Sequence, residues 1–448
     1  MNARLALWLL TYLILALLSL RSRSWSMVLY LLCSLIAPHR WWWGLSALRF
    51  PFMDSAVAIM GLAAILHQRR ENDVLGPVDP VISSLSLLTI LNVTAVTCFA
   101  VSFDLSLVEA ILKIKLLLVC TLMIAVVRSE ADLKRVLLSL VVMLAVVSIE
   151  SHFTYRGGGR LEKMAVSGAA GSNQIGSFWA SLMPLFLVAA LQSRWIVRLG
   201  LLASVPFVLN LFLKTGSRGA MLGLSGAYAT LFLISRARTR RFIFAGGVVA
   251  AAVFFYLLKD PELIARYLGI STASEVDESA AGRLVFWQCG LQAIRANPLG
   301  LGGDCWDRIV SIDYLAAAGL PETGRSVHQG FINEALSWGV QGLLLLLGLQ
   351  LTSLWRAHRG MRMYLQLGDS LAAVRCGCYT AGIVSLMITG MFGCYLNYEN
   401  SYLLFMLSAV DYRLAAARLV EPQSAPRMNP NPLRTDWRAL PASVGHVN

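Results

Sequence analysis

The chain is mostly apolar, but three short polar segments contain residues that can bind or transfer a charged group. The first is Thr215–Gly219. Thr215 or Ser217 can cap the helix that follows, and the free N–H groups and positive dipole end of that helix attract anions. Arg218 adds a guanidinium that binds phosphate through two parallel hydrogen bonds, and Gly219 lets an anion approach the backbone. An ordinary helix cap with a snorkelling arginine is the alternative.

The second segment, 282–287, begins an amphipathic stretch with Arg283 and ends in an Asn-Pro-Leu-Gly-Leu-Gly-Gly turn at 297–303. The third contains His328, which can accept a proton from a hydroxyl group near neutral pH. A solvated surface arginine and a histidine without a catalytic role are the alternatives. If the three segments share one membrane face, they describe a hydroxyl attacking a diphosphate-linked glycan, with arginines stabilising the departing diphosphate.

Lys113 lies in an apolar run about two turns from its outer end. It either reaches the same diphosphate or snorkels to the interface. The sequence contains no cluster of metal-ligand residues and gives no indication of a cofactor, although Asp304 and Asp307 are candidate cation ligands. Cys289 and Cys305 are either a disulfide pair in an oxidising compartment or free, buried thiols.

The composition indicates which elements position these residues. The chain has 57% hydrophobic and only 14% charged residues, against roughly a quarter charged in soluble proteins. Continuous apolar runs predict helices, and lipid requires all backbone groups to be paired within the protein. We therefore predict an all-α polytopic membrane protein with about 12–13 transmembrane helices, in the runs 4–20, 25–37, 54–67, 81–101, 106–127, 133–150, 174–191, 195–213, 219–235, 242–258, 330–354, 371–392 and 398–416.

Lys and Arg concentrate in alternate short loops, which the positive-inside rule places in the cytoplasm. This distribution explains the net charge of +13 without a nucleic-acid partner. The predicted parts are N-terminal transmembrane helices (1–258), a large periplasmic loop with short helices (259–329), C-terminal transmembrane helices (330–416) and a disordered cytoplasmic tail (417–448). The active site is then expected to face outward, which in a bacterial inner membrane is the periplasm.

At these residues the chain resembles the O-antigen ligase and polymerase superfamily of bacterial membrane glycosyltransferases. One ligase pattern, Arg followed four positions later by Leu, fits Arg218 and Leu222. A second pattern has His, then Asn, Ser or Gln, nine residues, Gly, two residues, and then Gly, Thr or Tyr. It fits His328, Gln329, Gly339 and Gly342. Pro38-His39-Arg40 and Trp43-Gly44 also resemble the exosortase-associated putative O-glycosylation ligases.

The resemblance implies a GT-C-like, metal-independent and inverting glycosyltransferase. Its donor would be a glycan on undecaprenyl diphosphate, and its acceptor a hydroxyl on a glycan, lipid or protein. Arg218 and Arg283 would bind the diphosphate, together with Ser217, Gly219 and Lys113, and His328 would activate or orient the acceptor. The sequence lacks the paired arginine repeats described for polymerases, which favours a ligase. A polymerase of the same superfamily is the first alternative, and a lipid-linked glycan flippase or transporter is the second.

Overall fold

The computed structural model describes residues 3–38, 50–67, 73–154, 160–161, 171–268, 273–320 and 324–420, and in these ranges it contains helices and no strand. The helices are α1 (Ala3–Arg21), α2 (Ser24–Leu35), α3 (Phe52–Leu66), α4 (Pro80–Cys98), α5 (Phe103–Val126), α6 (Glu130–Thr154), α7 (Ser172–Leu182), α8 (Pro184–Gln192), α9 (Trp195–Lys214), α10 (Arg218–Ile234), α11 (Ala237–Leu257), α12 (Pro261–Leu268), α13 (Ala273–Ala296), the π-helix η2 (Trp306–Val310), α14 (Ser311–Ala317), α15 (Gly330–Gln366), α16 (Ser370–Gly390) and α17 (Glu399–Val420).

Each predicted apolar run contains one helix, except 174–191, which contains the bent pair α7 and α8. Among the described residues, seven helices are long and apolar enough to cross a membrane, or eight if the bent pair counts as one span. The remaining apolar helices are short, like α2, α3 and α10, or carry more charge, like α5 with Glu109, Lys113 and Lys115. The fold class predicted from composition is therefore confirmed: the protein is an all-α, multi-pass membrane protein.

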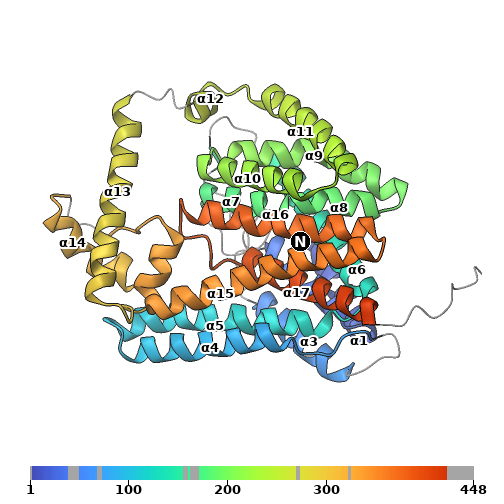
Figure 1. Ribbon diagram of the computed structural model, residues 1–448, viewed down its shortest axis with the longest axis horizontal. Helices are drawn as coiled ribbons and strands as arrows, with labels where there is room; N and C mark the ends of the chain where they lie inside the picture. The colour runs from blue at the N-terminus through green and yellow to red at the C-terminus, as the bar shows by residue number, and fades with distance from the viewer. Residues whose placement is uncertain are drawn as a thin grey trace, which may run out of the picture.

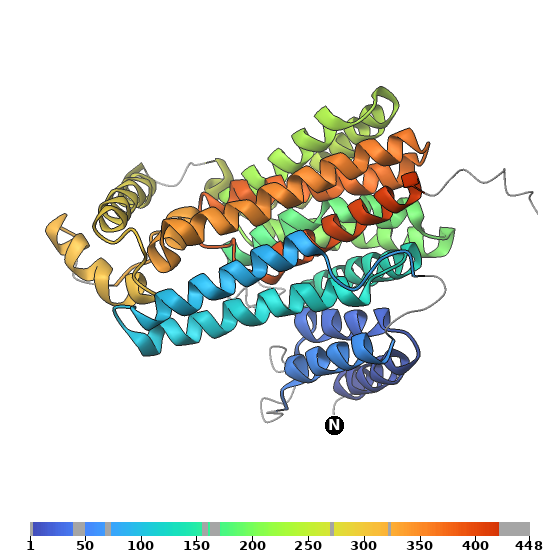
Figure 2. The same ribbon diagram turned by 60° about the horizontal axis from the view of Figure 1, so that its bottom comes forward.

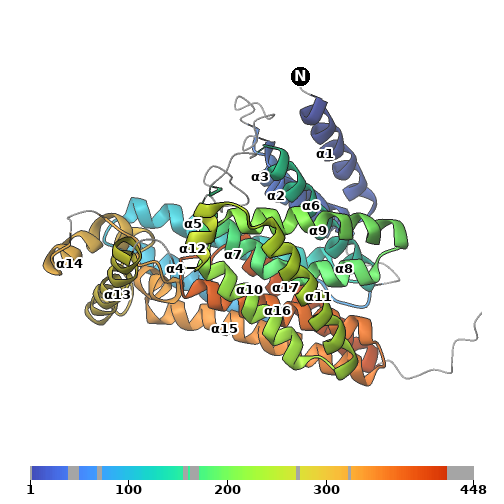
Figure 3. The same cartoon turned by 90° about the horizontal axis from the view of Figure 1, so that it is seen from above.

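The long helices lie side by side along the long axis of the molecule, while α13 stands across one end of them (Figure 1). We call this end, where α13 and α14 lie, the loop end of the bundle. The opposite end, where α17 finishes, is called the tail end. The first three helices form a group beside α6, to one side of the main bundle (Figures 2 and 3). The polar segments singled out in the sequence lie at helix termini of the loop end or in the 259–329 loop.

Close helix packing at the centre of the bundle depends on glycines of α10. Gly219, Gly223 and Gly226 recur on one face, and any Cβ added to them would collide with α16 or with Phe392 just after it. Small residues let two helix backbones approach closely in a membrane, where apolar side chains alone provide little driving force. This contact fixes the start of α10, and therefore Arg218, against the loop-end terminus of α16.

Buried ion pairs connect helices at the tail end. Arg375 of α16 donates to Asp411 of α17 at 2.6 Å and to Glu130 of α6 at 2.5 Å, and the side chains of Arg375 and Asp411 are fully buried. Arg356 pairs with Asp79 at 2.8 Å. Buried charges persist where each one is paired and hydrogen-bonded. Some of the charge at this end therefore joins helices rather than facing the solvent.

Three details refine the sequence predictions. Helix α17 continues to Val420, four residues beyond the predicted end of the last apolar run at 416, and residues 421–448 lie outside the described residues. His39 to Trp43 and Gly44, which carry most of the exosortase-type resemblance, also lie outside the described residues. Cys289 and Cys305 are free and buried, so the disulfide alternative is wrong for this structure.

Candidate active site at the loop end

The turn between α9 and α10 holds the first predicted segment. Ser217 is the N-cap of α10, and its buried hydroxyl accepts the Ala220 N–H at 3.3 Å, so the predicted cap is confirmed. Arg218 is the first residue of the helix and is exposed, with no hydrogen bond or ion pair to any described residue. Leu222 follows one turn later and is also exposed. The arginine therefore lies beside the free N–H groups of a capped helix terminus.

Arg160 and its neighbour Leu161 stabilise this turn through hydrogen bonds. Arg160 donates its Nε–H to the Thr215 carbonyl at 2.9 Å and an Nη–H to Asn173 Oδ1 at 2.7 Å. The neighbouring Leu161 N–H donates to the Lys214 carbonyl at 2.7 Å. Two strong donors thus satisfy carbonyls at the end of α9, which have no partner inside their own helix. Sequence reasoning assigned no role to Arg160, because only the folded chain brings 160–161 onto this turn.

The second and third predicted segments meet at His328. Its ring centroid lies 6.4 Å from that of Phe286, one turn after Arg283 on α13. The pKa of His328 is lowered, first by partial desolvation and then by the positive charges of Arg283 and Arg325. A lowered pKa keeps the imidazole neutral and able to accept a proton at neutral pH. The sequence analysis did not identify Arg325. The only sign of its role in the sequence is that this cation lies three residues before the candidate base, His328.

His328 has an unusual backbone conformation. Its φ is +51°, in the left-handed region that few residues other than glycine adopt. The next residue, Gln329, is extended and caps α15, with its side-chain oxygen accepting the Ile332 N–H at 2.5 Å. The ligase pattern allows Asn, Ser or Gln here, and side chains of all three types can accept this bond. The cap and the left-handed residue together direct His328 away from the start of the helix.

The connection between α16 and α17, residues 391–398, lies against both the start of α10 and the segment before His328. Phe392 lies against Gly219 of α10, and Cys394 Sγ lies 3.3 Å from the Ser326 hydroxyl beside His328. Burial raises the pKa of Tyr395 to about 12, while the charges of Arg283 and Arg160 both act in the opposite direction. The contact of Phe392 with Gly219 and that of Cys394 with Ser326 place the α10 turn and the His328 segment on the same connection. The structure thus brings the three predicted segments together around 391–398.

A break in α15 explains the two glycines of the His328 pattern. Gly339 has φ +78° and ψ 174°, so α15 consists of a short first segment, 330–338, and a long second one. The 297–303 turn binds at this break through its main chain: Leu301 N–H donates to Leu336 O at 2.7 Å, and Val340 N–H donates to Pro298 O at 2.9 Å. Gly342 then allows the Trp338 side chain to lie against the helix, with Trp338 Cβ 2.5 Å from where a Cβ of residue 342 would be.

Lys113 is buried and has an acidic partner. Its side chain is 5% exposed, forms an ion pair with the fully buried Glu334 of α15, and has its ammonium 5.6 Å from the Trp338 ring centroid. The contact with diphosphate predicted for Lys113 therefore remains a prediction, and in this structure the ammonium already has an acidic partner. Lys115, two residues on, is exposed and lies 3.5 Å from Asp54.

Two carboxylates lie in the loop near His328. Asp304 has φ +58° and pairs with Arg308 at 3.0 Å, while burial and the charge of Asp304 raise the pKa of Asp307 to about 6. Within the described ranges, no group of three or more His, Cys, Asp and Glu side chains could hold a metal ion. The two aspartates, considered above as cation ligands, therefore lack a third such ligand among these residues.

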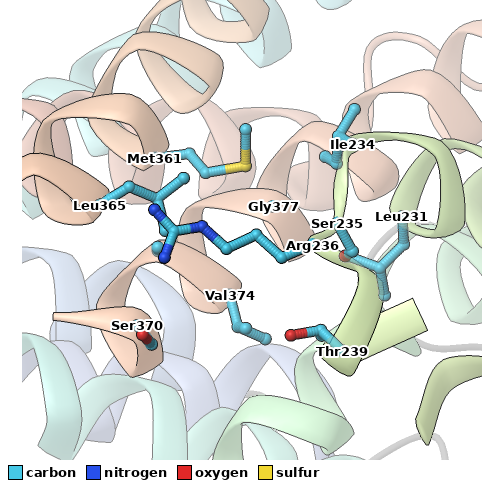
Figure 4. A pocket seen from close by; sticks show the side chains of 11 residues that line it. Leu231, Ile234, Ser235, Arg236, Thr239, Met361, Leu365, Ser370, Val374 and Gly377 are labelled. Atoms are coloured by element: carbon cyan, nitrogen blue, oxygen red, sulfur yellow. The ribbon is translucent and has the colours of Figure 1, made fainter. Parts of the chain in front are cut away.

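A pocket at the tail end is separate from this site. It lies between the α10–α11 turn and α15–α16, and the Arg236 side chain extends across it (Figure 4). The other lining residues are apolar or carry a hydroxyl group: Leu231, Ile234, Ser235, Thr239, Met361, Leu365, Ser370, Ala373, Val374 and Gly377. Because α10 and α15 span the bundle between this pocket and Arg218 or His328, the pocket takes no part in chemistry at the loop end.

Residues 202–347 match a family model described as O-antigen ligase. The match runs from α9 to the second segment of α15, so it includes Arg218, Arg283, His328 and the glycines of the break. No curated protein matches the chain. The family is one of ligase- or polymerase-type glycan transfer, in which a membrane enzyme uses a lipid-linked glycan donor. The matched region, which holds the candidate site, is therefore an O-antigen ligase-type region within a multi-pass membrane protein.

Proposed function

We propose that the protein is a glycan ligase of the bacterial inner membrane. It transfers a preassembled oligo- or polysaccharide from undecaprenyl diphosphate to an acceptor hydroxyl at the periplasmic face. The observation that supports this proposal is that one end of the bundle holds an exposed arginine on a capped helix terminus, Arg218, as well as a histidine whose pKa is lowered by Arg283 and Arg325. This combination suits a reaction with a dianionic leaving group and a neutral nucleophile.

The donor diphosphate lies between Arg218 and Arg283 in this proposal. Arg218 contributes its guanidinium together with the N-terminal N–H groups of α10, and both favour a phosphate oxygen. Arg283 contributes the opposing guanidinium from α13. Positive groups already in place stabilise the charge that grows on the diphosphate as its bond to the sugar breaks. The reaction then proceeds without a metal ion.

His328 acts on the acceptor. The neutral imidazole takes the proton of the acceptor hydroxyl as that oxygen attacks the anomeric carbon on the face opposite the diphosphate. The new glycosidic bond forms while the bond from sugar to diphosphate breaks, so the anomeric configuration inverts and undecaprenyl diphosphate departs. The lowered pKa of His328 supports this role, since a protonated imidazole could not accept the proton.

A test uses purified protein in liposomes with an undecaprenyl diphosphate glycan, EDTA and a panel of acceptors. Wild type should transfer the glycan, and His328→Ala should reduce the rate by about 10²–10⁴-fold, the range for loss of a general base. His358→Ala is the matched control, because His358 lies in the part of α15 near the tail end.

The acceptor identifies the reaction type. Transfer to a lipid, protein or unrelated glycan supports a ligase, whereas extension of a second lipid-linked repeat unit would make the protein a polymerase with the same donor site. A lack of transfer to every acceptor, combined with movement of the lipid-linked glycan across the bilayer, would replace the enzyme proposal with a transporter.

A further inference from the structure

We propose that the buried Lys113–Glu334 ion pair is a positioning device for His328, an inference that rests on the function proposed above. The pair fixes the short first segment of α15, residues 330–338, to α5 and to the 391–398 connection. Lys113 and Glu334 are then positioning residues that hold the base in place, and neither touches the donor.

The pair lies at a junction of three elements. The carboxylate of Glu334 accepts from the Lys113 ammonium on one side and from Asn397 Nδ2 at 2.8 Å on the other. Lys113 belongs to α5, Glu334 to α15 and Asn397 to the 391–398 connection. The Glu334 side chain is fully buried, so both contacts form in a low-dielectric region where charge-assisted hydrogen bonds are strong.

The short segment of α15 needs such an anchor. It begins at the Gln329 cap, immediately after His328, and ends at Gly339, where the helical hydrogen bonds are interrupted. A helix of this length is not stable by itself and depends on packing with its neighbours. Glu334 lies near the middle of the segment. Its two contacts therefore set both the position and the rotation of the segment that directly follows His328.

The same geometry argues against a donor-binding role for Lys113. Its side chain is 5% exposed, its charge is neutralised by Glu334, the Trp338 ring lies beside the ammonium, and Glu109 of the same helix adds a second negative charge. Moving the ammonium to a diphosphate would leave a fully buried carboxylate without its cation, which is strongly unfavourable. Removing the pair should therefore change the catalytic rate and leave donor binding unchanged.

The test compares wild type with Lys113→Met/Glu334→Met. This double substitution removes both charges and keeps a similar volume, an exchange that is often neutral for stability. A displacement of about 1 Å at a reacting group can cost on the order of 10²-fold in rate. We expect kcat to fall by about that factor with the donor KM unchanged. Lys113→Met/Glu334→Gln, which keeps an acceptor for Asn397, should lie between it and wild type.

Lys115→Met is the matched control, because it removes an exposed lysine of the same helix. Asn397→Ala removes one contact and leaves the buried Glu334 carboxylate paired with Lys113, so it tests the proposal if the double variants do not fold. We expect its kcat to fall by about tenfold. Hydrogen exchange of the 330–338 amides provides a readout that does not depend on transfer, and exchange should be faster in each positioning variant.

Normal kcat with unchanged exchange in the double variant, or in Asn397→Ala, would overturn the proposal. A raised donor KM with normal kcat would also overturn it, because that result places Lys113 at the diphosphate. An inactive wild type would count against the proposed function instead, and the exchange measurement would still test whether the pair holds the segment.

Discussion

Replacing Gly339 by alanine tests whether the break in α15 sets the active-site geometry. With φ +78° and ψ 174°, Gly339 occupies a region of backbone conformation that is essentially restricted to glycine. An added Cβ would lie 2.5 Å from the Leu299 carbonyl oxygen, which is backbone and cannot move like a flexible side chain. Gly339→Ala must therefore strain the residue and displace the 297–303 turn.

The size of the effect follows from these two terms. Forcing a residue with a side chain into this conformation costs roughly 1–3 kcal/mol. Loss of one main-chain hydrogen bond between the turn and the break, such as that from Val340 N–H to Pro298 O, adds about 1 kcal/mol. The sum is about 2–4 kcal/mol. Because this turn joins α13, which carries Arg283, to the segment that follows His328, a shift of about 1 Å should lower transfer by roughly 100-fold.

Gly348→Ala is the control for Gly339→Ala. Gly348 lies in the regular part of α15, where an added Cβ would be 3.6 Å from Leu85 Cδ2, an ordinary contact. Alanine should stabilise that position by up to about 1 kcal/mol. Thermal unfolding in detergent and glycan transfer would be measured for both variants. If Gly339→Ala unfolds at the wild-type temperature and transfers at the wild-type rate, the break does not position the site.

Three further predictions concern single side chains. Arg218→Ala should lower the transfer rate by about 10²–10³-fold. Arg218→Lys should also transfer slowly, because an ammonium lacks the guanidinium fork. Transfer assays with membrane-inserted protein check both variants, and a normal rate for either would remove Arg218 from the site. Arg325→Gln removes a positive neighbour of His328, so the pKa of His328 should rise and the acid limb of the kcat/KM profile should move to higher pH; an unmoved limb would mean that His328 is not the base. Asp307 has a folded-state pKa of about 6, above its ordinary 3.8, so its contribution to stability falls as pH rises between these values. Asp307→Asn should therefore raise the unfolding temperature at pH 8 and change it little at pH 4, and equal shifts at both pH values would contradict this reasoning.

The sequence predicts the helices well, because lipid leaves the backbone few alternatives and long apolar runs have one stable form. It also predicts the cap at Ser217 and identifies the arginine and histidine residues that lie at the loop end. Both predictions depend on signals that are local in the chain, such as a hydroxyl residue before a helix or a pattern of fixed spacing.

The contacts that the sequence could not predict join distant parts of the chain. Lys113 appeared as an unpaired intramembrane charge, because nothing local indicates that Glu334 of α15 lies opposite it. Arg160 gives no local signal either, because its partners Thr215 and Asn173 lie elsewhere in the chain. The sequence could not predict the break at Gly339 for a similar reason. A glycine in an apolar run is typical of close packing in a continuous helix as well as of a break in the helix.

The way the 259–329 loop is attached to the bundle has a consequence for how such enzymes can diversify. The 297–303 turn binds the break in α15 through main-chain groups, and these groups are the same whatever side chains the loop carries. Outward-facing positions of the loop can therefore change without altering the register of the attachment. Because Arg283 and His328 lie in this same loop, the attachment can hold both side chains at the candidate site while the residues around them vary.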